Sequence, residues 1–251
     1  MSRLIDQLNI WVLVGILGLV LLFALVLGAL FILSLAACLF EKQRVRDFIP
    51  ATPDTLPAPS PYFEAMTQAA QDLGFQPAGT FVQDRKGAMY KCYLGLWLSP
   101  DEKSLLCIGG GKIAGMNYKR TSLISKTGGD NSLVTTDEFG SEDMSGTRLV
   151  EVLMNADLGE LVYLHQQRLD SSTGEPRQLD ANRLLLELEE WNKIRVDYLV
   201  QDGLAKYESQ DENLWRFTPK GACLNAIRSH LRGISKGQSQ SERLSKKRPG
   251  S

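Results

Sequence analysis

The chain has 251 residues, a formal net charge of −1 and 43% hydrophobic residues. This length suffices for one medium domain or two small ones besides a membrane anchor. The charge is uneven: eight Lys and Arg face one Glu between Pro219 and Ser251, which leaves residues 62–218 at −8. An acidic domain of this kind is not expected to bind nucleic acid, whereas a basic tail can meet anionic lipid.

The four cysteines divide unevenly along the chain. Cys38 lies in an apolar run, and Cys92, Cys107 and Cys223 lie beyond it. Three is an odd number, and the spacing fits neither a disulfide framework nor a zinc site. We therefore expect free thiols in a reducing compartment, with no bound metal or cofactor.

Residues 1–9 form a short flank, and residues 10–40 form an apolar run in which Ser34 is the only polar side chain. About 20 apolar residues suffice to cross the hydrocarbon core of a bilayer as a helix. We predict an uncleaved single-pass helix in the cell membrane, surrounded by membrane lipid. Trp11 is expected at the membrane interface, where an indole ring is favoured.

Basic residues on the two sides of the run predict its orientation. Lys42, Arg44 and Arg46 follow the run, and Arg3 with the amino terminus precedes it. Positive residues are retained on the cytoplasmic side of a membrane. We therefore expect these three residues at the cytoplasmic interface and the large C-terminal domain in the cytosol.

Leu35-Ala36-Ala37-Cys38 resembles the lipobox of bacterial lipoproteins. That resemblance implies cleavage and lipidation at Cys38, which would place the domain outside the cytoplasm. The apolar core is longer than in such signals, and Leu39-Phe40 follows where polar residues are usual. The uncleaved span is the preferred interpretation, and the lipoprotein is its alternative.

Residues 41–61 combine the basic flank with a segment containing five prolines between Pro50 and Pro61. Proline at this density favours an extended polyproline II conformation. We predict a linker that spaces the domain from the bilayer; the alternative is a ligand for a proline-recognising domain.

Residues 62–175 alternate between helical and strand-like patterns. Apolar periodicity predicts helices over Tyr62–Leu73 and around Leu158–Leu169. The strand-like runs between them are Gly79–Gln83, Ala88–Leu98, Ser104–Ile108, Lys119–Ile124, Ser132–Thr136 and Arg148–Met154. Short turns between such runs allow antiparallel hairpins but no crossover helices. The sequence therefore predicts an α+β fold, an antiparallel sheet flanked by helices.

Several segments in this region imitate functional motifs. Gly109, Gly111 and Ala114 match a dinucleotide-binding turn, but no amphipathic helix follows, so we expect a glycine-rich strand end or bulge. Gly128-Gly129-Asp130 resembles the diguanylate-cyclase signature without its following Glu-Phe, which favours a turn. A third segment is rich in carboxylates that could bind calcium, but it lacks the ligand spacing of a calcium loop. We expect a solvated acidic loop, formed by Asp137, Glu138, Glu142 and Asp143.

An enzymatic function would have few candidate residues. The catalytic candidates are His165, on a helical apolar stripe, and Cys92, in a strand-like run. No partner residue can be assigned to either one by spacing. A buried structural histidine and a buried apolar cysteine are the preferred interpretations.

Residues 180–232 are predicted to be largely helical. Asp180 can cap a helix that opens at Ala181 and ends at Gly203. The expected apolar stripe of this helix is Leu184, Leu188, Trp191, Ile194 and Tyr198.

Residues 199–221 resemble the wing segment of winged-helix domains. The resemblance rests on Asp202-Gly203-Leu204, which closes a helix, and on Phe217-Thr218-Pro219-Lys220-Gly221, which opens the next. It implies a hairpin between them. No turn before Gly203 separates two helices as DNA recognition requires, and residues 181–232 hold eight basic and eight acidic side chains. We therefore expect a hairpin used for packing.

Residues 233–251 are expected to form a disordered basic tail. Lys246, Lys247 and Arg248 can contact anionic lipid. Taken with the anchor, these patterns predict a single-pass membrane protein that presents a non-enzymatic interaction or ligand-sensing module, with a protein partner as one option. The alternatives are a membrane-tethered nucleic-acid-binding regulator and an enzyme of unrecognised type.

Overall fold

The computed structural model describes residues 2–40, 42–45, 48–52, 54–55, 60–83, 90–113, 116–137, 143–209, 211 and 213–228. The chain forms two compact units. Unit 1 comprises Met1–Glu41 and Phe217–Ser251, and unit 2 comprises Lys42–Arg216.

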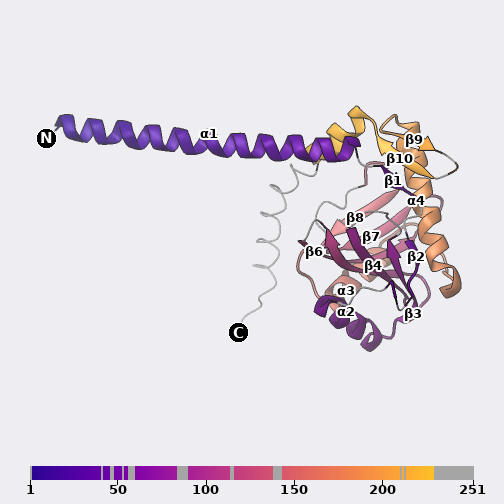
Figure 1. The fold of residues 1–251 in the computed structure, drawn as a ribbon. Coiled ribbons are helices and arrows are strands. Elements are labelled where there is room, and N and C mark those ends of the chain that lie inside the picture. Colours follow the sequence, from indigo (N-terminus) through magenta and orange to yellow (C-terminus); the bar gives the residue numbers. More distant parts are fainter. Residues whose placement is uncertain are drawn as a thin grey trace, which may run out of the picture. The chain divides into compact units, whose positions relative to one another are not determined.

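Unit 1 contains the long helix α1 (Ser2–Phe40) (Figure 1). Its part Val14–Phe40 is long and apolar enough to cross a membrane, and its most apolar stretch packs against nothing in the described chain. A second helix covers residues 219–228, and the Gly221 N–H donates a hydrogen bond of 3.2 Å to Thr218 Oγ1. The predicted helix start at Thr218-Pro219 is thereby confirmed. Within this unit the Asn225 side chain donates to Cys38 Sγ at 3.2 Å.

Unit 2 is built on a seven-stranded sheet in the order β2-β3-β4-β5-β6-β7-β8. The strands are β2 (Phe48–Pro50), β3 (Gln76–Gln83), β4 (Tyr90–Leu98), β5 (Leu105–Ile113), β6 (Met116–Lys126), β7 (Ser132–Thr136) and β8 (Arg148–Val152). Neighbours are antiparallel except β7 and β8, which are parallel. The predicted α+β fold is confirmed, with a mixed sheet where a purely antiparallel one was expected.

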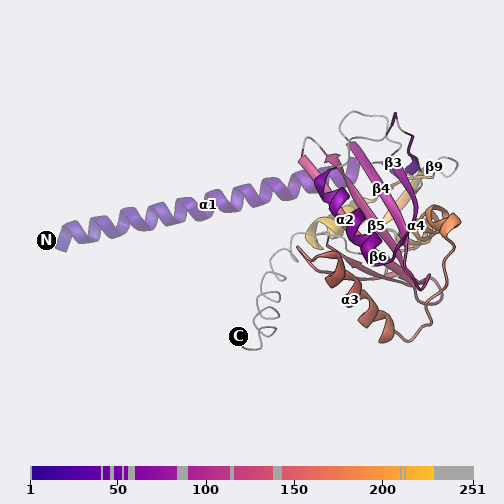
Figure 2. The ribbon, with the colours of Figure 1, turned by 90° about the horizontal axis from the view of Figure 1, so that it is seen from below.

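Helices cover both faces of this sheet (Figures 1 and 2). On one face α2 (Pro61–Asp72) and α3 (Leu158–Asp170) pack around Leu106, Ile108 and Leu123. On the other face α4 (Leu184–Gln201) packs through Leu184 and Trp191 against Leu94, Leu96, Cys107 and Ile124. Alternate residues of a strand point to opposite faces, so each central strand supplies both cores.

Local signals explain where the helices begin. Ser60 caps α2 by accepting from Phe63 N, and Pro61 occupies a position where proline is tolerated. Asp157 and Glu160 form a reciprocal capping box on α3. Asp180 accepts from Asn182 N, as expected, but the first turn, η1 (Ala181–Arg183), is a 3₁₀ helix that precedes α4.

A small second sheet has the order β1-β10-β9, formed by β1 (Gln43–Arg44), β10 (Leu214–Phe217) and β9 (Ala205–Ser209). The wing-like hairpin therefore exists as two neighbouring strands. The other neighbour of β10 is β1, which was expected within a linker. Because β1 and β2 precede the proline-rich segment and both belong to unit 2, that segment connects β2 to α2 inside the unit.

The glycine run at 109–111 lies inside β5, further from the strand end than expected. Tyr93 on β4 pairs with Gly110, and a methyl group at Gly110 would lie 2.5 Å from the Tyr93 hydroxyl oxygen. Tyr93 donates from there to Ser60 Oγ at 2.8 Å. Gly110 is thus required by the ring that crosses it. The Gly128-Gly129 turn between β6 and β7 is confirmed, with positive φ at both residues.

The buried stripe of α4 differs from the expected one. Tyr198 is 36% exposed, whereas Val196 and Glu187 are buried. The reason for Glu187 is an ion pair: Arg177 Nη2 lies 3.1 Å from Glu187 Oε1. A paired carboxylate can be buried where an unpaired one cannot, and the pairing is invisible in the helical pattern.

Candidate arginine-lined binding site

A cavity of about 250 Å³ lies in unit 2 between the sheet and α4. Its floor includes Gly109, on the same strand face as the buried Cys107. Because Gly109 has no side chain, space remains below the helix. The remaining lining residues are Gln43, Arg44, Val45, Phe48, Cys92, Tyr93, Leu94, Cys107, Arg120, Ile124, Arg148, Leu188, Asn192, Arg195, Val196 and Trp215.

Four arginines from four elements reach this cavity. Arg44 lies on β1, Arg120 on β6, Arg148 at the start of β8 and Arg195 on α4. Arg44 is exposed, and the other three are half-buried. Among the described residues that line the cavity there is no Asp or Glu. The cavity wall is therefore strongly positive.

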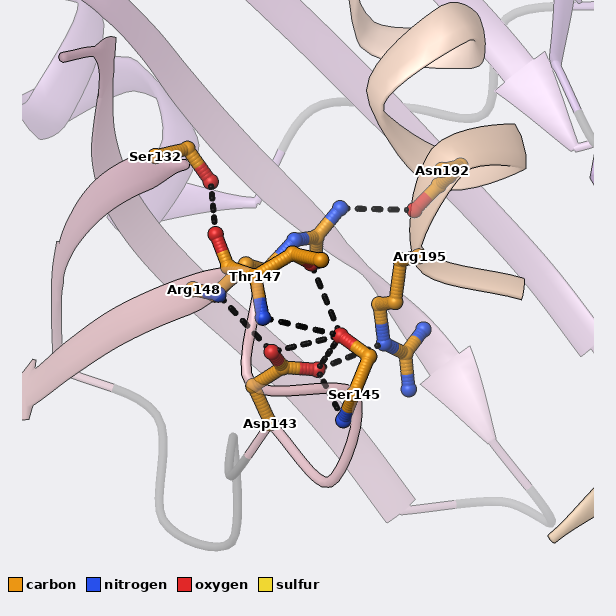
Figure 3. Close-up of polar contacts among 7 residues, drawn as sticks. All are labelled: Ser132, Asp143, Ser145, Thr147, Arg148, Asn192 and Arg195. Atoms are coloured by element: carbon orange, nitrogen blue, oxygen red, sulfur yellow. Dashed lines mark hydrogen bonds and ion pairs between the residues drawn. The ribbon is translucent and has the colours of Figure 1, made fainter. Parts of the chain in front are cut away.

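One carboxylate stands directly behind this wall. The Asp143 side chain is 1% exposed, and Arg195 Nε lies 3.4 Å from its Oδ1 (Figure 3). Asp143 also accepts from Ser145 Oγ at 2.6 Å and from the Arg148 backbone N–H at 2.8 Å. Asp143 is thus built into the fold as an internal counter-ion, and the expectation of a solvated acidic loop is wrong for this residue.

Neighbouring hydrogen bonds hold the guanidinium groups in place. Arg148 Nη2 donates to Asn192 Oδ1 on α4 at 2.9 Å (Figure 3). Arg120 Nε donates to Ser122 Oγ at 3.0 Å. The Arg195 guanidinium lies 6.0 Å from the centroid of the Trp215 ring, within range of a cation–π contact. These contacts fix the positions of Arg120, Arg148 and Arg195.

Burial and neighbouring charges shift the pKa values of these groups. Burial and the neighbouring charge of Arg195 lower the pKa of Arg148 to about 9. Burial also lowers the pKa of Arg195, against the opposing effect of Asp143. Burial alone would raise the pKa of Asp143, but hydrogen bonds from Ser145 and the charge of Arg195 outweigh it and lower that pKa.

Apolar side chains also line the cavity. Leu94 and Ile124 project from the sheet, and Leu188 and Val196 from α4. Cys92, a catalytic candidate from the sequence, also lines the cavity and is 8% exposed. Burial raises the pKa of the neighbouring Cys107 to about 12, so its thiol stays protonated and packs as an apolar group.

His165, the other sequence candidate, lies away from this cavity on the opposite face of the sheet. It is 2% exposed, and its ring nitrogens hydrogen-bond Ser125 Oγ and Thr135 Oγ1, each at 2.9 Å. Burial, with the nearby charge of Arg168, lowers its pKa to about 3. His165 and Cys92 are therefore not brought together, and His165 is a neutral group inside a polar network.

The expected membrane-interface residues are placed only in part. Lys42 is exposed, and Arg44 borders the cavity. Arg46, the Trp11 side chain and the basic tail with Lys246, Lys247 and Arg248 lie outside the part that the structure describes. Their predicted contacts with lipid stay predictions.

Arg120, Arg148 and Arg195 were not selected from the sequence. They come from a middle strand, an edge strand and a helix, so no spacing links them. The acidic net charge of residues 62–218 also conceals a local positive cluster. One signal in the sequence could have indicated Arg195. It lies one helical turn after Trp191, on the predicted buried face of the helix, where a cation needs a partner.

Within the described residues, no group of three or more His, Cys, Asp and Glu could hold a metal ion. Fold and cavity together define an α+β protein with an N-terminal membrane-length helix and an arginine-lined cavity. Comparison with models of protein families, with curated proteins and with solved structures found no match.

Proposed function

We propose that this chain is a single-pass membrane protein whose unit 2 binds a small ligand in the cavity between the sheet and α4. The observation that carries the proposal is the cavity itself, which is lined by both polar and apolar side chains. Concave sites that combine an apolar wall with a few convergent polar groups are typical of small-molecule binding.

A binding role agrees better with this site than a catalytic one. The cavity lining contains no histidine among its described residues, and the Cys107 thiol beside it is protonated at neutral pH. Guanidinium groups bind and orient but do not exchange protons near neutral pH. The proposed module therefore senses or captures a ligand.

The membrane arrangement belongs to the same proposal. The helix Val14–Phe40 anchors the chain. Lys42, Arg44 and Arg46 favour a cytosolic unit 2 by the rule that positive residues stay inside. The module would then report ligand levels in the cytosol from a fixed place at the membrane.

The binding proposal can be tested by filling the cavity. The full chain in nanodiscs is screened by ligand-observed NMR against anionic, neutral and cationic fragments. Gly109→Leu projects a side chain into the cavity from the floor, and Leu188→Trp fills it from α4. Both variants are expected to lose the fragments that the original chain binds.

A matched control is Gly18→Leu on α1, where a new side chain meets nothing within 4 Å. It should bind like the original chain. Thermal unfolding confirms that each variant is folded. Fragments that bind equally to the original chain and to both filled variants would contradict the proposal.

A further inference from the structure

Unit 1 contains a short second helix, residues 219–228, beside the end of α1. The contact that places it there is a hydrogen bond of 3.2 Å, which the Asn225 side chain donates to Cys38 Sγ. Cys38 lies two residues before Phe40, the last residue of α1, or about 3 Å along the helix axis. Helix 219–228 therefore touches the last turn of the membrane-length helix.

This contact sets the depth of the short helix in a membrane. The apolar part of α1, Val14–Phe40, has 27 residues, which extend over about 40 Å as a helix. The hydrocarbon core of a bilayer is about 30 Å thick, and the headgroup regions on its two sides bring the total to about 40–45 Å. When Val14–Phe40 crosses the bilayer, Cys38 lies at headgroup level, and helix 219–228 lies there with it.

One side of helix 219–228 is already packed. Ala222 and Ala226 are completely buried, and Gly221 is buried as well. With Asn225 they follow the spacing of one helical face, on which residues four apart are neighbours. The small side chains on this face permit a close approach to neighbouring segments.

The opposite side is largely apolar and is not fully covered. Lys220, Leu224 and Ile227 recur at spacings of four and three, so they share a face turned away from Ala222 and Ala226. Leu224 is half-buried, and Ile227 is 38% exposed. An apolar helix face with a basic residue beside it is suited to the boundary between headgroups and acyl chains.

We propose that helix 219–228 binds the membrane surface as an interfacial helix, with Leu224 and Ile227 at the boundary between headgroups and acyl chains. Lys220 and Arg228, both exposed, extend toward the headgroups. This inference rests on the membrane span of the proposed function and adds a second contact with lipid. Since α1 precedes unit 2 and helix 219–228 follows it, both ends of unit 2 then connect to membrane-bound segments.

Photo-crosslinking to lipid tests this contact. Benzoylphenylalanine replaces Ile227 in the full chain, which is placed in phosphatidylcholine nanodiscs and illuminated. The benzophenone joins to C–H bonds that it touches, and intact-mass spectrometry measures adducts with phosphatidylcholine. Leu17 on α1 is 66% exposed and should form the same adduct as position 227. Lys193 on α4 has a side chain that is 58% exposed; it is the matched position in unit 2 and should form far less.

Two substitutions show whether apolar contact is the cause. With benzoylphenylalanine in place of Arg228, Ile227→Asp should lower the lipid adduct about tenfold, because a charged side chain replaces one that gains by leaving water. Ile227→Leu is the matched control and should keep the adduct. Both variants should keep the unfolding temperature of unit 2, because Ile227 lies outside that unit.

The outcomes separate this inference from the proposed function. Lipid adducts at Leu17 but none at position 227 would overturn the interfacial helix and leave the membrane span intact. Adducts from position 227 to a second copy of the chain, in place of lipid, would overturn it as well and make this face a protein contact. A lipid adduct that Ile227→Asp leaves unchanged would also count against it. If neither Leu17 nor position 227 reacts with lipid, the membrane span of the proposed function itself fails.

Discussion

At the scale of single residues, unit 2 buries polar side chains only with specific partners. Asp143 is surrounded by Ser145, Arg148 and Arg195, and His165 bridges Ser125 to Thr135. Each arrangement favours one protonation state of the group. Since a pKa that differs between folded and unfolded states makes stability depend on pH, both groups lead to measurable predictions.

His165 should make the protein less stable in mild acid. Burial lowers its pKa to about 3 in the folded state, so between this value and about 6.5 the unfolded chain binds the proton more tightly. The contribution of neutral His165 to the unfolding free energy is therefore full above about pH 6.5 and is lost progressively as the pH falls. We expect a loss of about 2 kcal/mol between about pH 7 and pH 5, measured by urea unfolding with tryptophan fluorescence.

His165→Gln keeps hydrogen-bonding groups but does not titrate, so its unfolding free energy should change less over this interval. The control is His230→Gln, the other histidine of the sequence. If His165→Gln keeps the full pH dependence, the assignment of a neutral buried His165 is wrong.

Asp143→Asn should destabilise unit 2 strongly. The substitution leaves the Arg195 guanidinium without its carboxylate beside other cations. Removing one member of a buried pair costs about 3–5 kcal/mol, because the remaining charge is uncompensated. Chemical denaturation measures this loss.

Glu190→Gln provides the comparison. Glu190 lies 3.9 Å from Arg183, and both side chains are about half exposed, so the change should stay within about 0.5 kcal/mol. Equal effects of the two substitutions would show that Asp143 is not a buried counter-ion.

At the scale of elements, the positions of helices and strands follow from local signals. Apolar periodicity located α2 and α3 to within a residue or two, and β7 matched its predicted range Ser132–Thr136. The glycine run in β5 was misplaced, because glycine is disfavoured in strands. The Tyr93 ring that crosses Gly110 comes from the neighbouring strand, so no local pattern could show it.

The β4–β5 pair should be sensitive to a single methyl group. In Gly110→Ala the new Cβ would lie within 2.5 Å of the Tyr93 hydroxyl oxygen. The ring must move away from Ser60 and from Phe63, whose ring centroid lies 4.7 Å from that of Tyr93. Overpacking of this kind costs about 1–3 kcal/mol in unfolding free energy.

A double-mutant cycle with Tyr93→Leu tests the cause. Once the aromatic ring is gone, Gly110→Ala should cost little, so the two substitutions should be clearly non-additive. Additive costs would mean that the glycine is needed for another reason.

At the scale of the whole molecule, a membrane-length helix is joined to a unit that carries the proposed binding site. Unit 2 begins at Lys42, directly after α1 (Ser2–Phe40). If α1 crosses the bilayer, unit 2 begins at the membrane surface, and the side on which it lies decides which ligands reach the cavity. The orientation is therefore the main functional question at this scale.

We predict that unit 2 faces the cytosol. Lys193→Cys places a thiol on the exposed side of α4, and an impermeant maleimide should label it only after cells are permeabilised. Ser2→Cys on the other flank should be labelled in intact cells. Labelling of Lys193→Cys from outside would contradict the orientation.

Moving positive charge across the span should shift this orientation. Combining Lys42→Gln and Arg46→Gln with Gln7→Lys and Asn9→Lys reverses the charge bias. Since the bias sets topology, a fraction of Lys193→Cys should then become accessible in intact cells. An unchanged pattern would mean that another feature fixes the orientation.

The sequence by itself determined the membrane-length helix, the α+β class and most element positions, because these depend on apolar runs, periodicity and caps that lie close together in the chain. Only the tertiary structure decided the site. Arg120, Arg148, Asp143 and Arg195 are separated by up to 75 positions, and they meet because β6, β8 and α4 pack around the space that Gly109 leaves open. The electrostatic effect of these charges depends on their burial and on the distances between them, and no single stretch of the sequence specifies either.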